Sequence, residues 1–376
     1  MKRLSGYHLI AILLLGILLS CTEEIEINNA TDFDLFIAEE MDYQSIPAAA
    51  VLIFKGETIL YEKYFGKSNV EQNIPLADNH LFLIASISKV VTATALLQLY
   101  DDGKFELDDP INDHLPFDVV LPNYNTPITF RMLLTHTSGI ADNYDVLDRQ
   151  YYDNQDSPIS LSYFIENYFS EDGAFYDTNE NFYDFEPGAA HEYSNIGNAL
   201  IGVLVENISE QDFNSYCKQH IFNPLGMQNS FWRLDEIDKN IVIPYDDVNG
   251  QNRSIAHYTF TDFPNGGLRT TTKDLHFLAS AFVNGGQTGD VQLLKKSTAE
   301  AMFTPQITAI DNEVGLHLFV MDNQNNLWGH DGGEKGVSTI LGFNPTSKIG
   351  AIILTNQGEA ELDEVLVEAY KFGLKL

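Results

Sequence analysis

The sequence predicts an α/β protein in which an antiparallel sheet is flanked by helices and carries an inserted, mostly helical lobe. Runs rich in strand-forming residues lie near both ends of the chain, and residues from about 104 to 250 read mainly as helices and loops. Strands at the two ends need each other to form one sheet. At 44% hydrophobic over 376 residues the chain can bury a large core, so we expect a single domain over residues 35–376.

The elements follow in order from local pattern. "AAAVLIFKGETILYEKYFG" at 48–66 predicts a hairpin turning at "KGET", and the helical period of residues 88–101 ends before Gly103. Thr129 is a plausible N-cap for a short helix, and residues 198–222 predict two more helices. Strands are expected in "VGLHLFVMD", "GVSTILGFNP" and "KIGAIILTN", before a final amphipathic helix in "ELDEVLVEAYKFGL".

The first twenty residues differ from the rest. Lys2 and Arg3 precede an apolar stretch over 9–19, which is too short to span a bilayer and indicates a signal peptide over residues 1–20; the alternative is a retained membrane anchor. "LLSC" at 18–21 resembles a bacterial lipobox, which implies lipidation of Cys21 and an acidic tether over 21–34. We expect an exported lipoprotein facing the periplasm or the cell surface, with the choice of membrane left open.

The net charge of the chain limits the classes of partner that it can bind. The formal charge is −33, and removal of residues 1–20 leaves 19 basic against 54 acidic residues, a charge of −35. Nucleic acids and anionic surfaces are repelled, whereas neutral or cationic partners are favoured. Cys217 is the only cysteine besides Cys21, so no disulfide is expected within the folded domain.

Three short motifs carry candidate chemistry. Ser86 and Lys89 lie three residues apart at the start of a predicted helix, so they share a face, and burial would lower the lysine pKa enough for it to accept the serine proton. The alternative is a capping serine followed by a lysine that reaches solvent. Tyr193-Ser194-Asn195 offers a proton-transferring phenol and a substrate-orienting amide.

The third motif is His330-Asp331-Gly332 followed by Gly333. Glycines at a strand edge leave room for a substrate backbone and expose an N–H to a developing oxyanion.

Together, in this order, the motifs resemble those of the serine hydrolase family of class C β-lactamases, related esterases and penicillin-binding DD-peptidases. "LLTHTSGI", "NPLGM" and "GGLRTTTKDL" are also similar to family signatures, and the resemblance covers about residues 35–372. It implies Ser86 as acylated nucleophile and Lys89 and Tyr193 as the proton-handling pair. It also implies that Asn195 orients the substrate, that the N–H groups of Ser86 and Gly333 form an oxyanion hole, and that His330 and Gly332 belong to the same substrate-binding and oxyanion set. It implies no metal or organic cofactor, and places His136 in a scaffold turn.

One position departs from the family. True β-lactamases and DD-peptidases usually begin the third motif with lysine, whereas this chain has His330, followed by Asp331. A carboxylate facing that subsite would repel an anionic substrate, unless Lys335 or Arg269 compensates or Asp331 points away.

We therefore expect a serine hydrolase acting on an ester or amide of a small molecule or peptide. A D-amino-acid-specific peptidase is the next alternative, then a β-lactamase. A catalytically silent surface binding protein is the alternative of another class. The substrate and the oligomeric state stay open.

Residues 142–186 form a segment of distinct composition. They contain twelve acidic residues against the single basic Arg149, interleaved with tyrosines and phenylalanines. Two interpretations stay open, a solvated acidic loop and a substrate-facing lid.

Overall fold

The computed structural model describes residues 26–376. The helices are α1 (Ala30–Tyr43), α2 (Ser88–Asp101), α3 (Phe130–Leu134), α4 (Tyr144–Leu147), α5 (Leu161–Phe169), α6 (Asn195–Ser209), α7 (Phe213–Cys217), α8 (Asn223–Leu225), α9 (Thr272–Val283), α10 (Lys296–Met302) and α11 (Asp363–Gly373), with short turns that include η1 (Ala85–Ile87) and η6 (Phe263–Asn265). The predicted signal peptide and Cys21 lie outside the described residues. Within residues 26–376, no helix has the length and apolar character needed to cross a membrane.

The strands form one main sheet and several small pairs. They are β1 (Ala48–Lys55), β2 (Thr58–Asn69), β3 (Ile74–Pro75), β4 (Phe82–Leu83), β5 (Tyr151–Asp153), β6 (Tyr245–Asp247), β7 (Asn252–Ser254), β8 (Tyr258–Phe260), β9 (Arg269–Thr270), β10 (Gln287–Thr288), β11 (Val291–Gln292), β12 (Phe319–Asp322), β13 (Leu327–Glu334), β14 (Val337–Phe343) and β15 (Ile349–Thr355). The main sheet has the antiparallel order β12-β13-β14-β15-β1-β2-β3.

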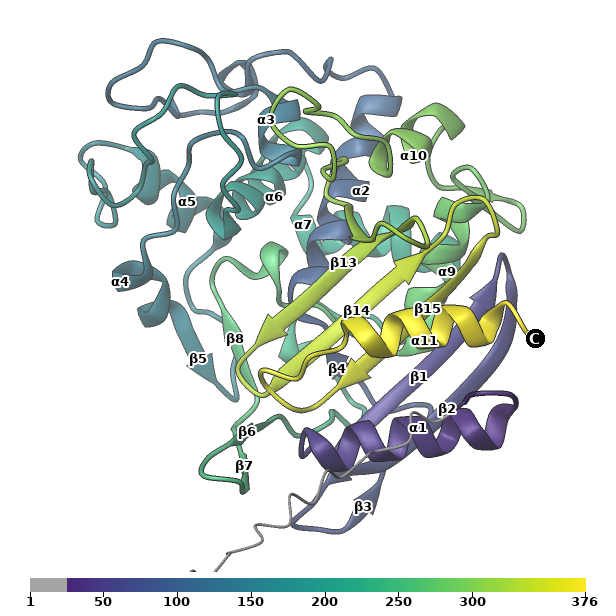
Figure 1. Cartoon of the computed structure of the whole chain (residues 1–376). Coiled ribbons are helices and arrows are strands. Elements are labelled where there is room, and N and C mark those ends of the chain that lie inside the picture. Colours follow the sequence, from purple (N-terminus) through teal and green to yellow (C-terminus); the bar gives the residue numbers. More distant parts are fainter. Residues whose placement is uncertain (1–25) are drawn as a thin grey trace, which may run out of the picture.

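Helices cover both faces of this sheet (Figure 1). Strand β1 shows why its sequence is continuously apolar: Ala49, Val51 and Ile53 pack into the core beneath α1 and α11, whereas Leu52 and Phe54 pack toward α2, α6 and α9. A strand buried on both faces cannot alternate with polar residues. The helix-rich side contains the larger core, and the candidate site lies there.

The predicted antiparallel sheet flanked by helices is confirmed. Strands from the two ends of the chain pair as expected, with Val51 of β1 opposite Ile353 of β15. The hairpin at "KGET" is present, since Lys55 pairs with Thr58 across the turn. Thr129 caps α3 by accepting a hydrogen bond from the backbone N–H of Met132 at 3.3 Å.

The folded domain begins earlier in the chain than predicted. Helix α1 begins at Ala30 inside the expected tether, and Asn29 caps it by accepting from the N–H of Thr31 at 2.9 Å. Phe33 is fully buried, with its ring centroid 4.8 Å from that of Phe372 in α11. The folded domain therefore begins before Leu35, because α1 covers apolar sheet surface that would otherwise meet water.

The predicted strand in "VGLHLFVMD" is also shorter than expected. Val314, Leu316 and Leu318 are buried, but β12 begins only at Phe319. Their apolar alternation reflects burial in a loop and not pairing in the sheet. The helical part correspondingly extends beyond residue 250, since α9 and α10 precede β12.

Candidate active site

Ser86 lies in η1, directly before α2, where the backbone is unusually constrained. The preceding residue, buried Ala85, has a φ of 46°, a left-handed conformation that costs a non-glycine residue about 1–2 kcal/mol. Strand β13 presses against this turn: a Cβ on Gly332 would lie 2.5 Å from the Ile84 carbonyl oxygen and 3.1 Å from the Ser86 nitrogen. Only glycine permits this approach, so the tertiary fold holds Ser86 in place from both sides.

Lys89 is fully buried one turn into α2 and points back to the serine. Its Nζ donates to Ser86 Oγ at 3.0 Å and to the Asn265 carbonyl oxygen at 2.7 Å. Burial lowers the pKa of Lys89 from 10.5 to about 7, although the carboxylates of Asp142 and Asp262 act in the opposite direction. A substantial fraction of Lys89 is thus neutral near pH 7, the form that can accept a proton.

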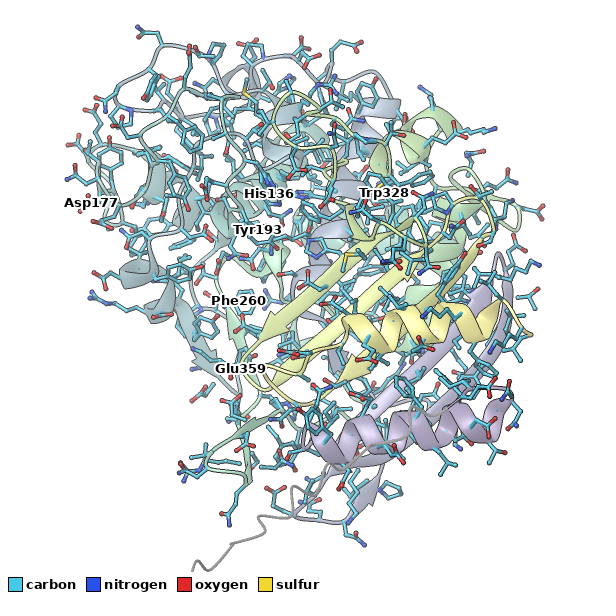
Figure 2. All side chains as sticks on the ribbon, viewed as in Figure 1. His136, Asp177, Tyr193, Phe260, Trp328 and Glu359 are labelled. Atoms are coloured by element: carbon cyan, nitrogen blue, oxygen red, sulfur yellow. The ribbon has the colours of Figure 1, made fainter. Side chains whose placement is uncertain are left out.

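Tyr193 faces the same pair of residues. Its ring centroid lies 4.9 Å from Lys89 Nζ and 4.4 Å from the ring of His136, and Figure 2 shows His136 and Tyr193 side by side where the helical part meets β13. Loss of water around the hydroxyl raises the pKa of Tyr193, while its interaction with Ser86 acts in the opposite direction. The lysine and the phenol therefore have pKa values displaced in opposite directions, which suits a proton acceptor and a proton donor.

His136 supports this arrangement from behind. It is buried, and its Nδ1 accepts from the N–H of Ser194 at 3.2 Å, while its carbonyl oxygen accepts from the N–H of Glu192 at 2.8 Å. These bonds hold the chain on both sides of Tyr193, which agrees with the scaffold role expected for His136.

Asp142 orients Asn195, a function that sequence reasoning missed. Its Oδ2 accepts from both the backbone N–H and the side-chain Nδ2 of Asn195, at 2.9 and 2.8 Å. Its Oδ1 accepts from the N–H of Ile196 at 3.0 Å and from the Ser194 hydroxyl at 3.2 Å. The carboxylate thus caps the N-terminus of α6 and fixes the amide of Asn195. The only available signal was an aspartate after "HTSGIA", with nothing to show that it meets residue 195.

These groups open onto a cavity of about 230 Å³. Its wall contains the candidate serine, the phenol and the amide, together with aromatic and acidic side chains from distant segments: Ala85, Ser86, Tyr144, Leu147, Asp148, Tyr151, Tyr193, Asn195, Phe260, Asp262, Asn265, Gly266, Gly333 and Glu334. Gly333 therefore lies in the cavity wall as expected, whereas Gly332 contributes through its contact with η1.

His330 does not line this cavity, contrary to its expected role in binding substrate. The side chain is only 2% exposed and sits behind Tyr193, with ring centroids 6.2 Å apart, and beside Phe319 at 5.2 Å. Its place on β13 turns it inward, toward the core, so it supports the Tyr193 ring.

Asp331 lies on the opposite side of β13 from His330. It is 73% exposed and lines a second cavity, of about 670 Å³, near α11. Arg269 cannot compensate for it, since the buried guanidinium donates to the carbonyl oxygens of Gly267 and Tyr258. The Lys335 Nζ lies 3.6 Å from the ring centroid of Tyr151. The negative charge at the serine comes instead from residues that the motifs did not include.

Residues 142–186 divide between the two interpretations. The beginning of the segment borders the site through α4 and Tyr151, whose hydroxyl donates to Glu334 Oε2 at 2.8 Å. Helix α5, in contrast, buries Phe164 and Ile165 in the main core. The segment is therefore neither a wholly solvated loop nor a separable lid.

Comparisons with known proteins agree with the fold. The family model described as "Beta-lactamase" matches residues 33–372. "Protein flp" of Staphylococcus aureus (strain MW2) is 25% identical over 329 residues, covering 86% of this chain; the chain spans 62% of that protein's length.

Solved structures also share the fold. The octameric penicillin-binding protein homologue from Pyrococcus abyssi has a TM-score of 0.73 at 26% identity, covering 92% of this chain and 77% of its own. A class C β-lactamase has a TM-score of 0.70 at 18% identity, covering 90% and 94%, a likeness that concerns the fold alone. On the match of the family model over nearly the whole chain, this protein belongs to the Beta-lactamase family.

Proposed function

We propose that the protein is a serine hydrolase that cleaves an ester or amide through an acyl-enzyme on Ser86. The observation that carries the proposal is the bond of 3.0 Å between a fully buried Lys89 and the Ser86 hydroxyl at the edge of a cavity. Lys89, with its pKa lowered to about 7 by burial, accepts the proton of Ser86 as Oγ attacks the carbonyl carbon. A surface binding protein would have no use for a buried lysine held in this way.

The remaining groups complete one turnover. The N–H groups of Ser86 and Gly333 stabilise the oxyanion, and Asn195, held by Asp142, orients the substrate amide or ester. Tyr193, protonated because its pKa is raised, delivers a proton to the leaving group. Water then attacks the acyl-enzyme, and its proton returns through the same pair, which restores the Ser86 hydroxyl.

A covalent probe tests the proposal directly. A fluorophosphonate should add mass to the wild-type protein and not to Ser86→Ala, with Lys89→Met labelled much more slowly. Equal labelling of wild type and Ser86→Ala, or no labelling of either, would contradict the proposed nucleophile and favour a silent binding protein.

A substrate panel separates the remaining alternatives. Short acyl esters should be hydrolysed faster than nitrocefin, because Asp148, Asp262 and Glu334 in the cavity wall repel its carboxylate. D-alanyl peptides test the peptidase alternative. Rapid repeated turnover of nitrocefin would instead support a β-lactamase.

We also propose that the chain is exported and anchored through a lipid on Cys21, on the strength of "LLSC" alone. Growth with an alkyne-bearing fatty acid should label the wild type and not Cys21→Ser. Equal labelling would contradict the anchor.

A further inference from the structure

The wall of the serine cavity is negatively charged and aromatic. Asp148, Asp262 and Glu334 line it, and no lysine, arginine or histidine among residues 26–376 does so. The nearest cation of the machinery, Lys89, already donates to Ser86 and Asn265 and is only partly charged near pH 7. A ligand entering this space therefore meets more acidic than basic side chains in a confined volume, where charges interact more strongly than in bulk water.

Asp262 is the most deeply buried of these three carboxylates. It is only 5% exposed, and its Oδ2 accepts from Asn265 Nδ2 at 2.6 Å. Its Oδ1 accepts no hydrogen bond from another residue among 26–376. Burial raises the pKa of Asp262 to about 7, so its carboxylate is only partly charged near pH 7, and a cation in the cavity would favour the charged form. Asp262 precedes η6, whose Asn265 also holds Lys89, so this oxygen belongs to the same rigid turn as the candidate machinery.

Aromatic rings add a second attraction for positive charge. Tyr144, Tyr151 and Phe260 line the same wall, and the face of an aromatic ring attracts ammonium groups. The Lys335 ammonium already lies 3.6 Å from the Tyr151 ring centroid, so among the described residues Tyr144 and Phe260 are the rings of this wall that contact no cation. Carboxylates and rings lining one cavity are the combination that recognises an organic ammonium group.

Building on the proposed function, we propose that the substrate is an ester or amide carrying an ammonium group close to the scissile bond, which binds against Asp262 and the aromatic wall. The cation neutralises the cavity and positions the carbonyl carbon at Ser86. A neutral substrate of the same shape fills the cavity without this attraction, and an anionic one is repelled.

Pairs of isosteric esters test the inference through binding affinity, without requiring hydrolysis. Butyrylcholine and 3,3-dimethylbutyl butyrate have the same shape, but only the first carries a positive charge, which lies on the leaving group. Ethyl 4-(trimethylammonio)butyrate and ethyl 5,5-dimethylhexanoate form a second pair, in which the charge lies on the acyl group. Titration calorimetry on full-length Ser86→Ala, which retains the cavity, should give a dissociation constant at least about tenfold lower for the cationic member of one pair. Equal affinities in both pairs, or preference for the neutral members, would overturn the inference.

Variants identify the carboxylate. In the Ser86→Ala background, Asp262→Asn should reduce the cationic-to-neutral affinity ratio by about tenfold. Asp172→Asn makes the same charge change at an exposed position outside the cavity and should leave the ratio unchanged. Equal loss of ratio in both variants would mean that net charge, not this site, selects cations.

Should Asp262→Asn fail to fold, Glu334→Gln provides the same comparison, and the affinity ratio measured on the Ser86→Ala protein stands by itself. Failure of the proposed function is recognised separately, by absence of fluorophosphonate labelling and of ester hydrolysis in the wild type, whatever the calorimetry shows.

Discussion

Gly332→Ala should reduce catalytic activity while the protein stays folded, because the added methyl group contacts the turn that carries Ser86. An ideal Cβ at this position lies 2.4 Å from Thr339 Oγ1 and 2.5 Å from the Ile84 carbonyl oxygen. Ordinary contacts between carbon and other heavy atoms are about 3.5 Å or longer, so a displacement of about 1 Å is needed. Thr339 cannot easily move away, since its hydroxyl donates to that same carbonyl oxygen at 2.9 Å. The strain is therefore relieved by moving β13 away from η1.

The expected loss follows from that displacement. Ser86 and Gly333, on either side of the gap, carry the proposed oxyanion donors, and one such donor contributes about 3–4 kcal/mol to the transition state. We expect kcat/KM to fall by about 10²–10³, since each 1.36 kcal/mol is about tenfold, whereas overpacking should cost about 1–3 kcal/mol of stability.

Hydrolysis of p-nitrophenyl acetate measures the loss, and circular dichroism checks that the variant is folded. Gly333→Ala is the matched comparison, because no atom lies within 4 Å of its ideal Cβ and its N–H is kept. Its effect should be confined to substrates large enough to reach the methyl. A folded Gly332→Ala with activity within about threefold of wild type would refute the reasoning.

Three further predictions concern the surroundings. Because Lys89 is proposed to act in its neutral form, kcat/KM should rise with pH through about 7. Lys89→Met should abolish turnover yet stabilise the fold in urea unfolding at pH 7, because burial disfavours the charged form of the lysine. Asp142→Asn should lower kcat at least about tenfold, because Asn195 loses the carboxylate that holds it. The change also removes an acidic neighbour of Lys89, so the rise of kcat/KM with pH should move to lower pH. An unchanged pH profile would contradict the electrostatic interaction between Asp142 and Lys89. Phe33→Ala should cost about 3–5 kcal/mol in the same unfolding assay while leaving KM unchanged, since Phe33 packs on the sheet face away from Ser86.

Lys89 also links pH to stability, with a definite sign. Its pKa is about 7 in the fold against an ordinary 10.5, so the unfolded chain binds more protons between these values. Its contribution should therefore make the free energy of unfolding rise as pH increases from about 7 to 10.5, a trend that Lys89→Met should lose.

Much of this protein could be predicted from its sequence where the determinants are local. The apolar runs of β1 and β15, the hairpin at Gly56 and the helix after Ser86 are set by residues near one another in the chain. The spacing of Ser86 and Lys89 is local too, because one helical turn suffices to bring them together. Local pattern did not predict that Phe33 belongs to the folded domain, because its burial depends on α11, which lies more than 300 residues away in the chain.

Only the tertiary structure decided what surrounds the serine. Asp142 meets Asn195, and Asp262 and Glu334 reach the same cavity as Tyr144, although no periodicity or spacing relates these positions. His330 and Asp331 are adjacent in sequence, yet β13 sends their side chains to opposite faces, because successive residues of a strand alternate. The sequence thus determined the catalytic candidates, whereas the packing of distant segments determined the charge of the cavity that they share.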